Sequence, residues 1–244
     1  MSPFWKALTR KAPASGPSYT CPVCGYGGAF TTLTPTTGTR PHAECPKCGA
    51  LERHRLQHLV FEALGATRDF SRMRMLHFAP EAFFRPYFQR RVREYKTADL
   101  FEKDVDFRVD ITKLPFEAGE YDFVFASHVL EHIDEDLKAI GEIRRVLSPG
   151  GIAILPVPVV SPRTIEYPEP NPFESGHVRA PGPDYFDRYR QFFSDVRVYT
   201  SADFPDEHQT YVFEDRSQLP TAESPLREPM PGVKHPDFVP VCVV

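Results

Sequence analysis

The chain has 244 residues, of which 41% are hydrophobic and 25% are charged, and its formal net charge is −4. This length suits one α/β domain with a small appendage. The acidic balance excludes a general electrostatic attraction to nucleic acid or to anionic membranes. No apolar run approaches the roughly 18 residues of a membrane-spanning helix, and residues 1–11 lack the apolar core of a signal peptide. We therefore expect a cytoplasmic protein without a membrane partner.

Two Cys-x-x-Cys-Gly motifs follow a polar tail expected over residues 1–18. Their cysteines are Cys21, Cys24, Cys45 and Cys48. Each motif is a tight turn that points two thiolates at one ion, and four thiolates complete the tetrahedral shell of a structural Zn²⁺. Disulfides are the alternative, and a cytoplasmic location disfavours them. The pattern predicts a zinc-binding, zinc-ribbon-like module with a linking helix over residues 19–70.

The linking helix is expected from Leu51 to about Leu64, where an apolar stripe follows the second cysteine motif. Residues 1–76 hold ten Lys and Arg against four Asp and Glu, so this end of the chain carries a charge of +6. A basic zinc module suits RNA phosphates or an anionic substrate. The alternative, which we favour, is a packing module whose charges are solvated or meet the acidic remainder of the chain.

A strand, a helix and a second strand follow one another in the middle of the chain. Tyr121–Ala126 is an aromatic and β-branched run typical of a buried strand. The helix is expected to begin at Asp134 as its N-cap, and the Ser-Pro-Gly-Gly run at residues 148–151 ends it. Residues 152–155 then read as the next buried strand. This crossover unit indicates an α/β protein with a parallel sheet.

This stretch, YDFVFASHVLEHI followed by RVLSPGGIAIL, resembles the middle of class I S-adenosylmethionine (SAM) dependent methyltransferases. The resemblance covers about residues 73–156, and the alternative is a crossover unit of another doubly wound fold. It implies a Rossmann-like, seven-stranded, mostly parallel sheet with helices on both faces over residues 71–214. Residues 195–200 and 210–214 are expected as the last two strands. Residues 215–244 are expected to form an extended C-terminal tail.

The resemblance also implies a SAM site, although its first loop departs from the family pattern. The family places an acidic-x-Gly-x-Gly loop after the first strand, where this chain has His77-Phe78-Ala79-Pro80-Glu81. Both glycines are missing, and His77 stands in the place of the acid. We expect a variant loop in which Ala79 is small enough for close approach and Glu81 contacts the SAM ammonium. The missing glycines also leave open a site that binds no cofactor.

Further cofactor residues are expected at the ends of the following strands. An acid at the tip of the second strand, Asp99, suits hydrogen bonds from both ribose hydroxyls. The stretch beginning Asp110-Ile111 resembles the family's D-I-T-x-L-P-F run, which implies that both residues border the adenine. The alternative for each Asp is a turn residue. The expected cofactor-binding residues are His77, Ala79, Glu81, Asp99, Leu100, Asp110, Ile111, Ser127 and His128.

Two histidines are candidate catalytic bases because an imidazole titrates near neutral pH. His132 follows the fourth strand, and His177 lies in a proline-rich loop over residues 157–183 that is expected to arch over the cofactor edge. Arg179 is a candidate anchor for a substrate carboxylate or phosphate. The alternative is that these side chains only hold their own loops in place.

The sulfonium of SAM activates its own methyl group, so the protein mainly aligns the acceptor and removes a proton where needed. We expect transfer to an oxygen or nitrogen of a small molecule, such as a sugar or another secondary metabolite. One alternative is an RNA base methyltransferase that grips its substrate with the basic zinc module. The other is a non-catalytic interaction protein on a methyltransferase scaffold, motivated by the missing glycines.

Overall fold

A computed structural model of the chain describes residues 16–35 and 38–244, so most of the tail expected over residues 1–18 lies outside the described part. The contacts divide the chain into two compact units, each built from several segments. The unit that we call the cysteine unit contains the chain up to Ala63, Val159–Gly182 and Tyr199–Phe238. The sheet unit contains Leu64–Pro158, Pro183–Val198 and Val239–Val244. The domain boundaries expected at residues 70 and 214 stay predictions.

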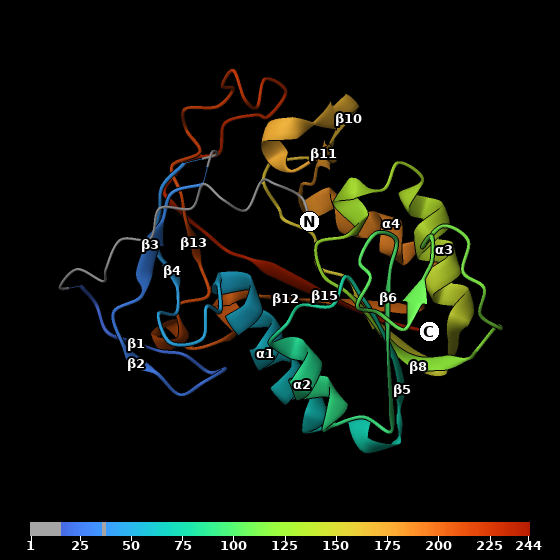
Figure 1. The fold of residues 1–244 in the computed structure, drawn as a ribbon. Helices are drawn as coiled ribbons and strands as arrows, with labels where there is room; N and C mark the ends of the chain where they lie inside the picture. The colour runs from blue at the N-terminus through green and yellow to red at the C-terminus, as the bar shows by residue number, and fades with distance from the viewer. Residues whose placement is uncertain (1–15, 36–37) are drawn as a thin grey trace. The chain divides into compact units, whose positions relative to one another are not determined.

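A seven-stranded sheet, ordered β12-β15-β9-β8-β5-β6-β7, is the frame of the sheet unit (Figure 1). Its strands are β5 (Arg74–Phe78), β6 (Glu94–Asp99), β7 (Phe107–Arg108), β8 (Tyr121–Ala126), β9 (Leu147–Ile154), β12 (Asp195–Thr200) and β15 (Phe238–Val243). The five from β5 to β9 pair in parallel, and β15 runs antiparallel to β9. Numbered along the chain, the order is 3-2-1-4-5-7-6, a doubly wound order with a reversed strand inserted near one edge. The Rossmann-like sheet expected from the sequence is therefore confirmed.

The centre of the sheet is apolar on both faces, as parallel strands covered by helices require. Phe123, Val124 and Phe125 of β8 are fully buried. Phe78 at the end of β5 is level with Ala126 of β8 and with Ala98 of β6. The residues that follow these three strands therefore leave the sheet at one common edge.

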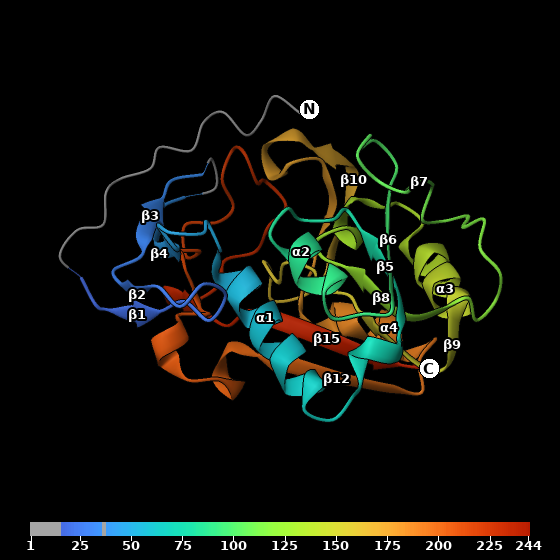
Figure 2. The same cartoon turned by 60° about the horizontal axis from the view of Figure 1, so that its bottom comes forward.

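The sheet unit contains the helices α2 (Phe84–Gln89), α3 (Asp136–Val146) and α4 (Phe186–Arg190). Figure 2 shows α3 beside β9 and α2 beside β6, in agreement with their contacts. The expected N-cap at Asp134 is wrong, because Glu135 precedes α3 without a capping side chain. Asp136 is instead buried, where it accepts a hydrogen bond of 2.7 Å from Tyr185 and forms an ion pair with Arg188 of α4. This buried carboxylate fixes the start of α3 in place of a cap.

The last strand of the sheet differs from the expectation. Val212–Phe213 forms β13, which pairs with β14 (Lys234–His235) in a separate two-stranded sheet, so residues 210–214 do not join the large sheet. The strand β15 fills that place from the segment expected to be a surface tail. Proline lacks an amide donor, yet Pro240 lies within β15, where its carbonyl accepts from the amide of Leu155 at 3.3 Å.

The cysteine unit contains small antiparallel pairs and one long helix. The paired strands are β1 (Tyr19–Thr20) with β2 (Gly27–Gly28), β3 (Thr31–Leu33) with β4 (Arg40–Glu44), and β10 (Ile165–Asn171) with β11 (His177–Ala180). The helix α1 (Glu52–Gly65) runs within one residue of the expected bounds at both ends. No helix in the described part of the chain is long and apolar enough to cross a bilayer.

Arg55 of α1 is the fully buried centre of the cysteine unit. Its guanidinium donates to the carbonyls of Ala43 at 3.0 Å and Ala50 at 2.6 Å, which flank the second cysteine motif. It also donates to the carbonyl of Gln209 at 2.6 Å and lies 4.4 Å above the ring of Phe30. Arg55 therefore ties the cysteine motifs to the distant 199–238 segment by hydrogen bonds to backbone carbonyls.

Candidate functional site

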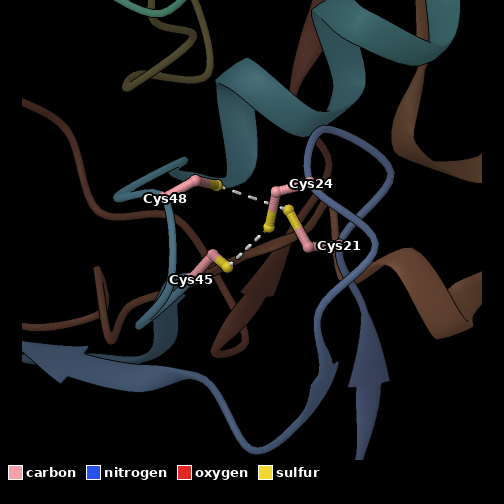
Figure 3. A group of neighbouring side chains, drawn as sticks. All are labelled: Cys21, Cys24, Cys45 and Cys48. Atoms are coloured by element: carbon pink, nitrogen blue, oxygen red, sulfur yellow. Dashed lines mark hydrogen bonds between the residues drawn. The ribbon is translucent and has the colours of Figure 1, made fainter.

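The four motif cysteines converge around one point in the cysteine unit (Figure 3). The Sγ atoms of Cys21 and Cys48 are 3.7 Å apart, as are those of Cys24 and Cys45, and all four sulfurs lie within 4.8 Å of one another. Four thiolates at ~2.3 Å from one Zn²⁺ form a tetrahedron with an edge of about 3.8 Å, whereas a disulfide needs about 2.05 Å. The spacing fits one tetrahedral ion and excludes two disulfides.

Each cysteine motif closes as a turn that needs its glycine. The amide of Gly25 donates to the carbonyl of Cys21, and the amide of Gly49 donates to that of Cys45, both at 2.9 Å. Both glycines adopt left-handed backbone angles, with φ of 70° and 75°, which side chains disfavour. Burial raises the pKa of Cys21 to about 11, so a thiolate at this position needs a cation beside it.

The ends of three neighbouring parallel strands form the candidate cofactor edge of the sheet unit. Asp99 ends β6, and its Oδ1 accepts from the amides of Phe101 at 2.6 Å and Glu102 at 2.8 Å. These bonds orient the carboxylate and use only one of its oxygens. The apolar side chains of Leu100 and Phe101, which follow Asp99, are 45% and 80% exposed to solvent. A carboxylate beside exposed apolar groups suits a nucleoside, with its hydroxyls and flat base.

Ala79 follows β5 at the same edge and has a positive φ of 45°. Its amide donates to the carbonyl of Ala98 at 3.0 Å, which fixes the turn. The family places a glycine here, and the backbone has kept a glycine-like conformation although the side chain is alanine. Non-glycine residues in this conformation are strained and cluster at functional sites.

We expect Ala79→Gly to keep the fold and to raise the free energy of unfolding by up to about 1 kcal/mol, because it removes the left-handed strain of a Cβ. Ala82→Gly is the matched control, since Ala82 is exposed and lacks a positive φ. There the same change only adds freedom to the unfolded chain and should lower stability. Denaturant titration of both variants measures the difference, and equal losses in both would contradict the strained loop.

His77 lies at the end of β5 and is fully buried, with its Nδ1 2.8 Å from the Tyr95 hydroxyl. Its ring packs against Phe88, Tyr95 and Phe125. Burial lowers the pKa of His77 to about 3, so the imidazole is neutral. The structure thus places His77 in an aromatic pocket beneath the loop, and its predicted contact with SAM stays a prediction.

The pKa of His77 makes stability depend on pH. Folding favours the neutral ring, so its contribution is complete above the ordinary pKa of about 6.5 and is lost as pH falls towards 3. We expect the wild type to lose up to ~1.4 kcal/mol per pH unit below 6.5 relative to His77→Phe. Unfolding free energies of both proteins at several pH values measure this slope. Parallel curves would show that His77 is not buried in its neutral form.

Two further predicted cofactor residues follow β7. Asp110 is exposed, and its Oδ1 accepts from the amide and the hydroxyl of Thr112, both at 2.8 Å. These bonds make Asp110 a turn residue in its own right. Ile111 beside it is 5% exposed. A role of either residue at adenine stays a prediction.

Glu81 lies ahead of α2, and its carbonyl accepts from the amides of Phe84 and Arg85.

The end of β8 carries Ser127, His128, Glu131 and His132. Ser127 is buried, and His128 has a positive φ of 54° with its amide bonded to the carbonyl of Pro156 at 2.9 Å. Glu131 is fully buried between the two histidines. Its Oε1 lies 3.4 Å from Nδ1 of His128 and 4.0 Å from Nε2 of His132. Every predicted cofactor residue and one of the two candidate bases thus belong to the sheet unit.

The other candidate base, His177, belongs to β11 of the cysteine unit. Its Nδ1 lies 4.0 Å from Glu174, a buried carboxylate that accepts from the Tyr167 hydroxyl at 2.9 Å. Arg179 is also buried and donates to Glu166 at 3.0 Å. The sequence analysis assigned no role to Glu131 or Glu174. Each of these glutamates lies in a short turn, three residues from a histidine, and this spacing is the sequence signal that could have pointed to both.

Residues 84–155 match the family described as a methyltransferase domain. The seven-stranded sheet is that of the class I, SAM-dependent methyltransferases, as the resemblance implied. Among solved structures, a SAM-dependent methyltransferase from Mesorhizobium loti covers 75% of this chain and 97% of its own, with a TM-score of 0.49 and 16% identity.

Two curated proteins match shorter stretches. An uncharacterized 37.1 kDa protein in transposon TN4556 of Streptomyces fradiae is 40% identical over 60 residues, or 25% of this chain. A hybrid PKS-NRPS synthetase of Macrophomina phaseolina is 41% identical over 64 residues, or 26% of this chain. The matched stretches span only 17% and 2% of the lengths of these relatives.

Proposed function

We propose that the protein uses SAM to methylate an oxygen or nitrogen of a small molecule. The observation that carries the proposal is the common edge at which β5, β6 and β8 end. Asp99, the left-handed Ala79 and the Ser127–His128 turn leave the sheet together at this edge. Open α/β sheets bind their ligands outside the carboxyl ends of the strands, next to the point where the strand order reverses.

Each part of this edge has a role in the proposed cofactor site. The free Oδ2 of Asp99 accepts from the ribose hydroxyls, while Oδ1 holds the following loop. Leu100 supplies an exposed apolar surface for the adenine, and Asp110 and Ile111 border the adenine from the turn that follows β7. The turn at Ala79 brings bare backbone close to the methionine end of SAM. When bound, the cofactor supplies an activated methyl group, and the protein orients the acceptor.

We also propose that the four cysteines bind a structural Zn²⁺. Their sulfur spacing supports four thiolate ligands, which complete a tetrahedral shell and leave no position for substrate. The ion would hold the two cysteine motifs together below Arg55, whose guanidinium bonds to the carbonyls of Ala43 and Ala50. Zinc therefore supports the fold of the cysteine unit and takes no part in methyl transfer.

The placement of the basic residues favours a small acceptor over RNA. Arg55 is fully buried, and Arg40 forms an ion pair of 2.8 Å with the buried carboxylate of Glu52. These two arginines of the cysteine unit are occupied within the protein. RNA binding relies on Lys and Arg that reach phosphates from the surface. For Arg40 and Arg55, the packing role favoured from the sequence therefore explains the contacts better than RNA binding does.

Transfer of labelled methyl groups tests the proposal. Wild-type protein and Asp99→Ala are incubated with methyl-labelled SAM and either a low-molecular-mass cell filtrate or total RNA. We expect label in a product of the filtrate with the wild type alone. Label in RNA that ribonuclease releases would overturn the acceptor class. Label in neither fraction, together with absent cofactor binding, would overturn methyl transfer itself.

A further inference from the structure

A buried carboxylate beside the candidate cofactor edge has no role in the function proposed so far. Glu131 lies in the short turn Leu130–His132 after β8 and is fully buried. An ionised carboxylate out of water is costly unless a cation or hydrogen-bond donors face it. Its Oε1 lies 3.4 Å from Nδ1 of His128 and 4.0 Å from Nε2 of His132. The nearer imidazole is therefore the better donor to this oxygen.

The backbone conformation of His128 is fixed by a hydrogen bond, and its side chain is less exposed than that of His132. Its positive φ of 54° is fixed by the hydrogen bond from its amide to the carbonyl of Pro156, which joins the ends of β8 and β9. Such a conformation costs on the order of 1 kcal/mol or more in a non-glycine residue, and it persists only where the surroundings impose it. His132 is more exposed, with 35% of its side chain accessible against 24% for His128.

The second nitrogen of His128 points to a ligand. Nε2 is buried and makes no hydrogen bond within residues 16–35 and 38–244. A buried polar atom without a partner is destabilising, and a ligand that bonds to it removes this cost. A proton on Nδ1 would meet the Glu131 carboxylate, whose Oε1 lies 3.4 Å away, and would leave the lone pair on Nε2.

We propose that His128 is the base of the methyl transfer and that Glu131 is its positioning residue, an inference that rests on the proposed function. The acceptor oxygen or nitrogen forms a bond to the methyl carbon of SAM as the sulfur–methyl bond breaks. The electron pair of that bond stays on sulfur and gives neutral S-adenosylhomocysteine. The acceptor proton passes to Nε2 of His128, and the Glu131 carboxylate stabilises the imidazolium through Nδ1–H.

The proposal gives His128 a proton-transfer role in addition to its expected contact with the cofactor. It also separates two histidines that the sequence presents alike, since His128 and His132 flank the same glutamate. A carboxylate that holds one imidazole nitrogen fixes the tautomer and leaves the other nitrogen as the base. His132, with its nitrogen farther from Glu131, is then the matched control.

Imidazole ¹⁵N NMR of the full-length, zinc-loaded protein tests the dyad without cofactor or acceptor. Spectra are recorded at about pH 8, above the ordinary histidine pKa near 6.5, and His128→Gln assigns the ring among the 9 histidines. We expect the Nδ1–H tautomer of His128 to dominate. Glu131→Met should shift the tautomer ratio at least about tenfold towards Nε2–H, because a hydrogen bond to a charged group is lost. Glu131→Gln should shift it less, since its carbonyl still accepts.

His132→Gln should leave the His128 tautomer unchanged. An Nε2–H tautomer of His128 in the wild type would overturn the dyad, and this result needs only the assignment variant His128→Gln to fold. An unchanged ratio in a folded Glu131→Met protein would do the same. Binding of S-adenosylhomocysteine, measured on the same samples, should stay within about twofold of wild type in Glu131→Gln. If the wild type does not bind S-adenosylhomocysteine, the proposed function fails. If it binds but His128 has the other tautomer, only the dyad fails.

Discussion

Cys45→Ser is expected to release the bound Zn²⁺ and to destabilise the cysteine unit by several kcal/mol. Structural zinc contributes apparent binding energies of about 10–16 kcal/mol to small modules, and a serine hydroxyl is a poor replacement for a thiolate. Cys45 is fully buried with Cys21, Phe30 and Ala50 in the small core of this unit. This core has few apolar residues, so the proposed ion would supply much of its stability. Metal analysis and thermal unfolding measure the two effects.

Cys242→Ser is the matched control, because Cys242 is a fully buried free cysteine outside the cluster. It should keep one zinc per chain and lose only the stability that a buried polar replacement costs, about 1–3 kcal/mol. Full metal content and wild-type stability in Cys45→Ser would rule out a site of four thiolates. Equal zinc loss in both variants would point to general unfolding.

Asp99→Ala should weaken the binding of S-adenosylhomocysteine by about 100-fold or more. Two hydrogen bonds from ribose hydroxyls to a carboxylate are lost, and bonds to charged groups contribute about 1.5–3 kcal/mol each. The sheet should persist, because among residues 16–35 and 38–244 the Asp99 carboxylate bonds only to the amides of Phe101 and Glu102 in its own loop. Calorimetric titration gives the affinity, and circular dichroism reports the fold.

Asp99→Asn separates the two tasks of this side chain. Its amide oxygen still accepts from the loop amides, so the loop keeps its shape while the negative charge is lost. We expect an affinity between those of the wild type and Asp99→Ala. An affinity within about twofold of wild type in Asp99→Ala would show that the ribose is bound elsewhere.

The central strands could be predicted because their sequence and their environment agree. Tyr121–Ala126 is apolar except for Asp122 and forms β8 with the expected bounds, since the other five residues of this strand are buried. The helix α1 and the cysteine cluster follow for similar local reasons. Residues 94–98 were expected as the second strand with Asp99 at its tip, and Asp99 ends β6.

Features that depend on distant contacts could not be predicted in this way. The strand β15 is built around Pro240, and its partner strand β9 ends about 85 residues earlier. The left-handed angle of Ala79 and the burial of Glu131 arise from tertiary packing, which a local pattern does not report.

Calorimetric titration of the zinc-loaded protein with S-adenosylhomocysteine tests the central claim most directly. The account predicts one site with an affinity near the micromolar range, about −8 kcal/mol, because the Ala79 turn keeps a glycine-like backbone beside Asp99. Binding should weaken by about 100-fold or more in Asp99→Ala and persist in Ala79→Gly. No detectable heat at millimolar ligand with a folded, zinc-loaded protein would contradict the account and identify the chain as a non-catalytic protein on a methyltransferase fold.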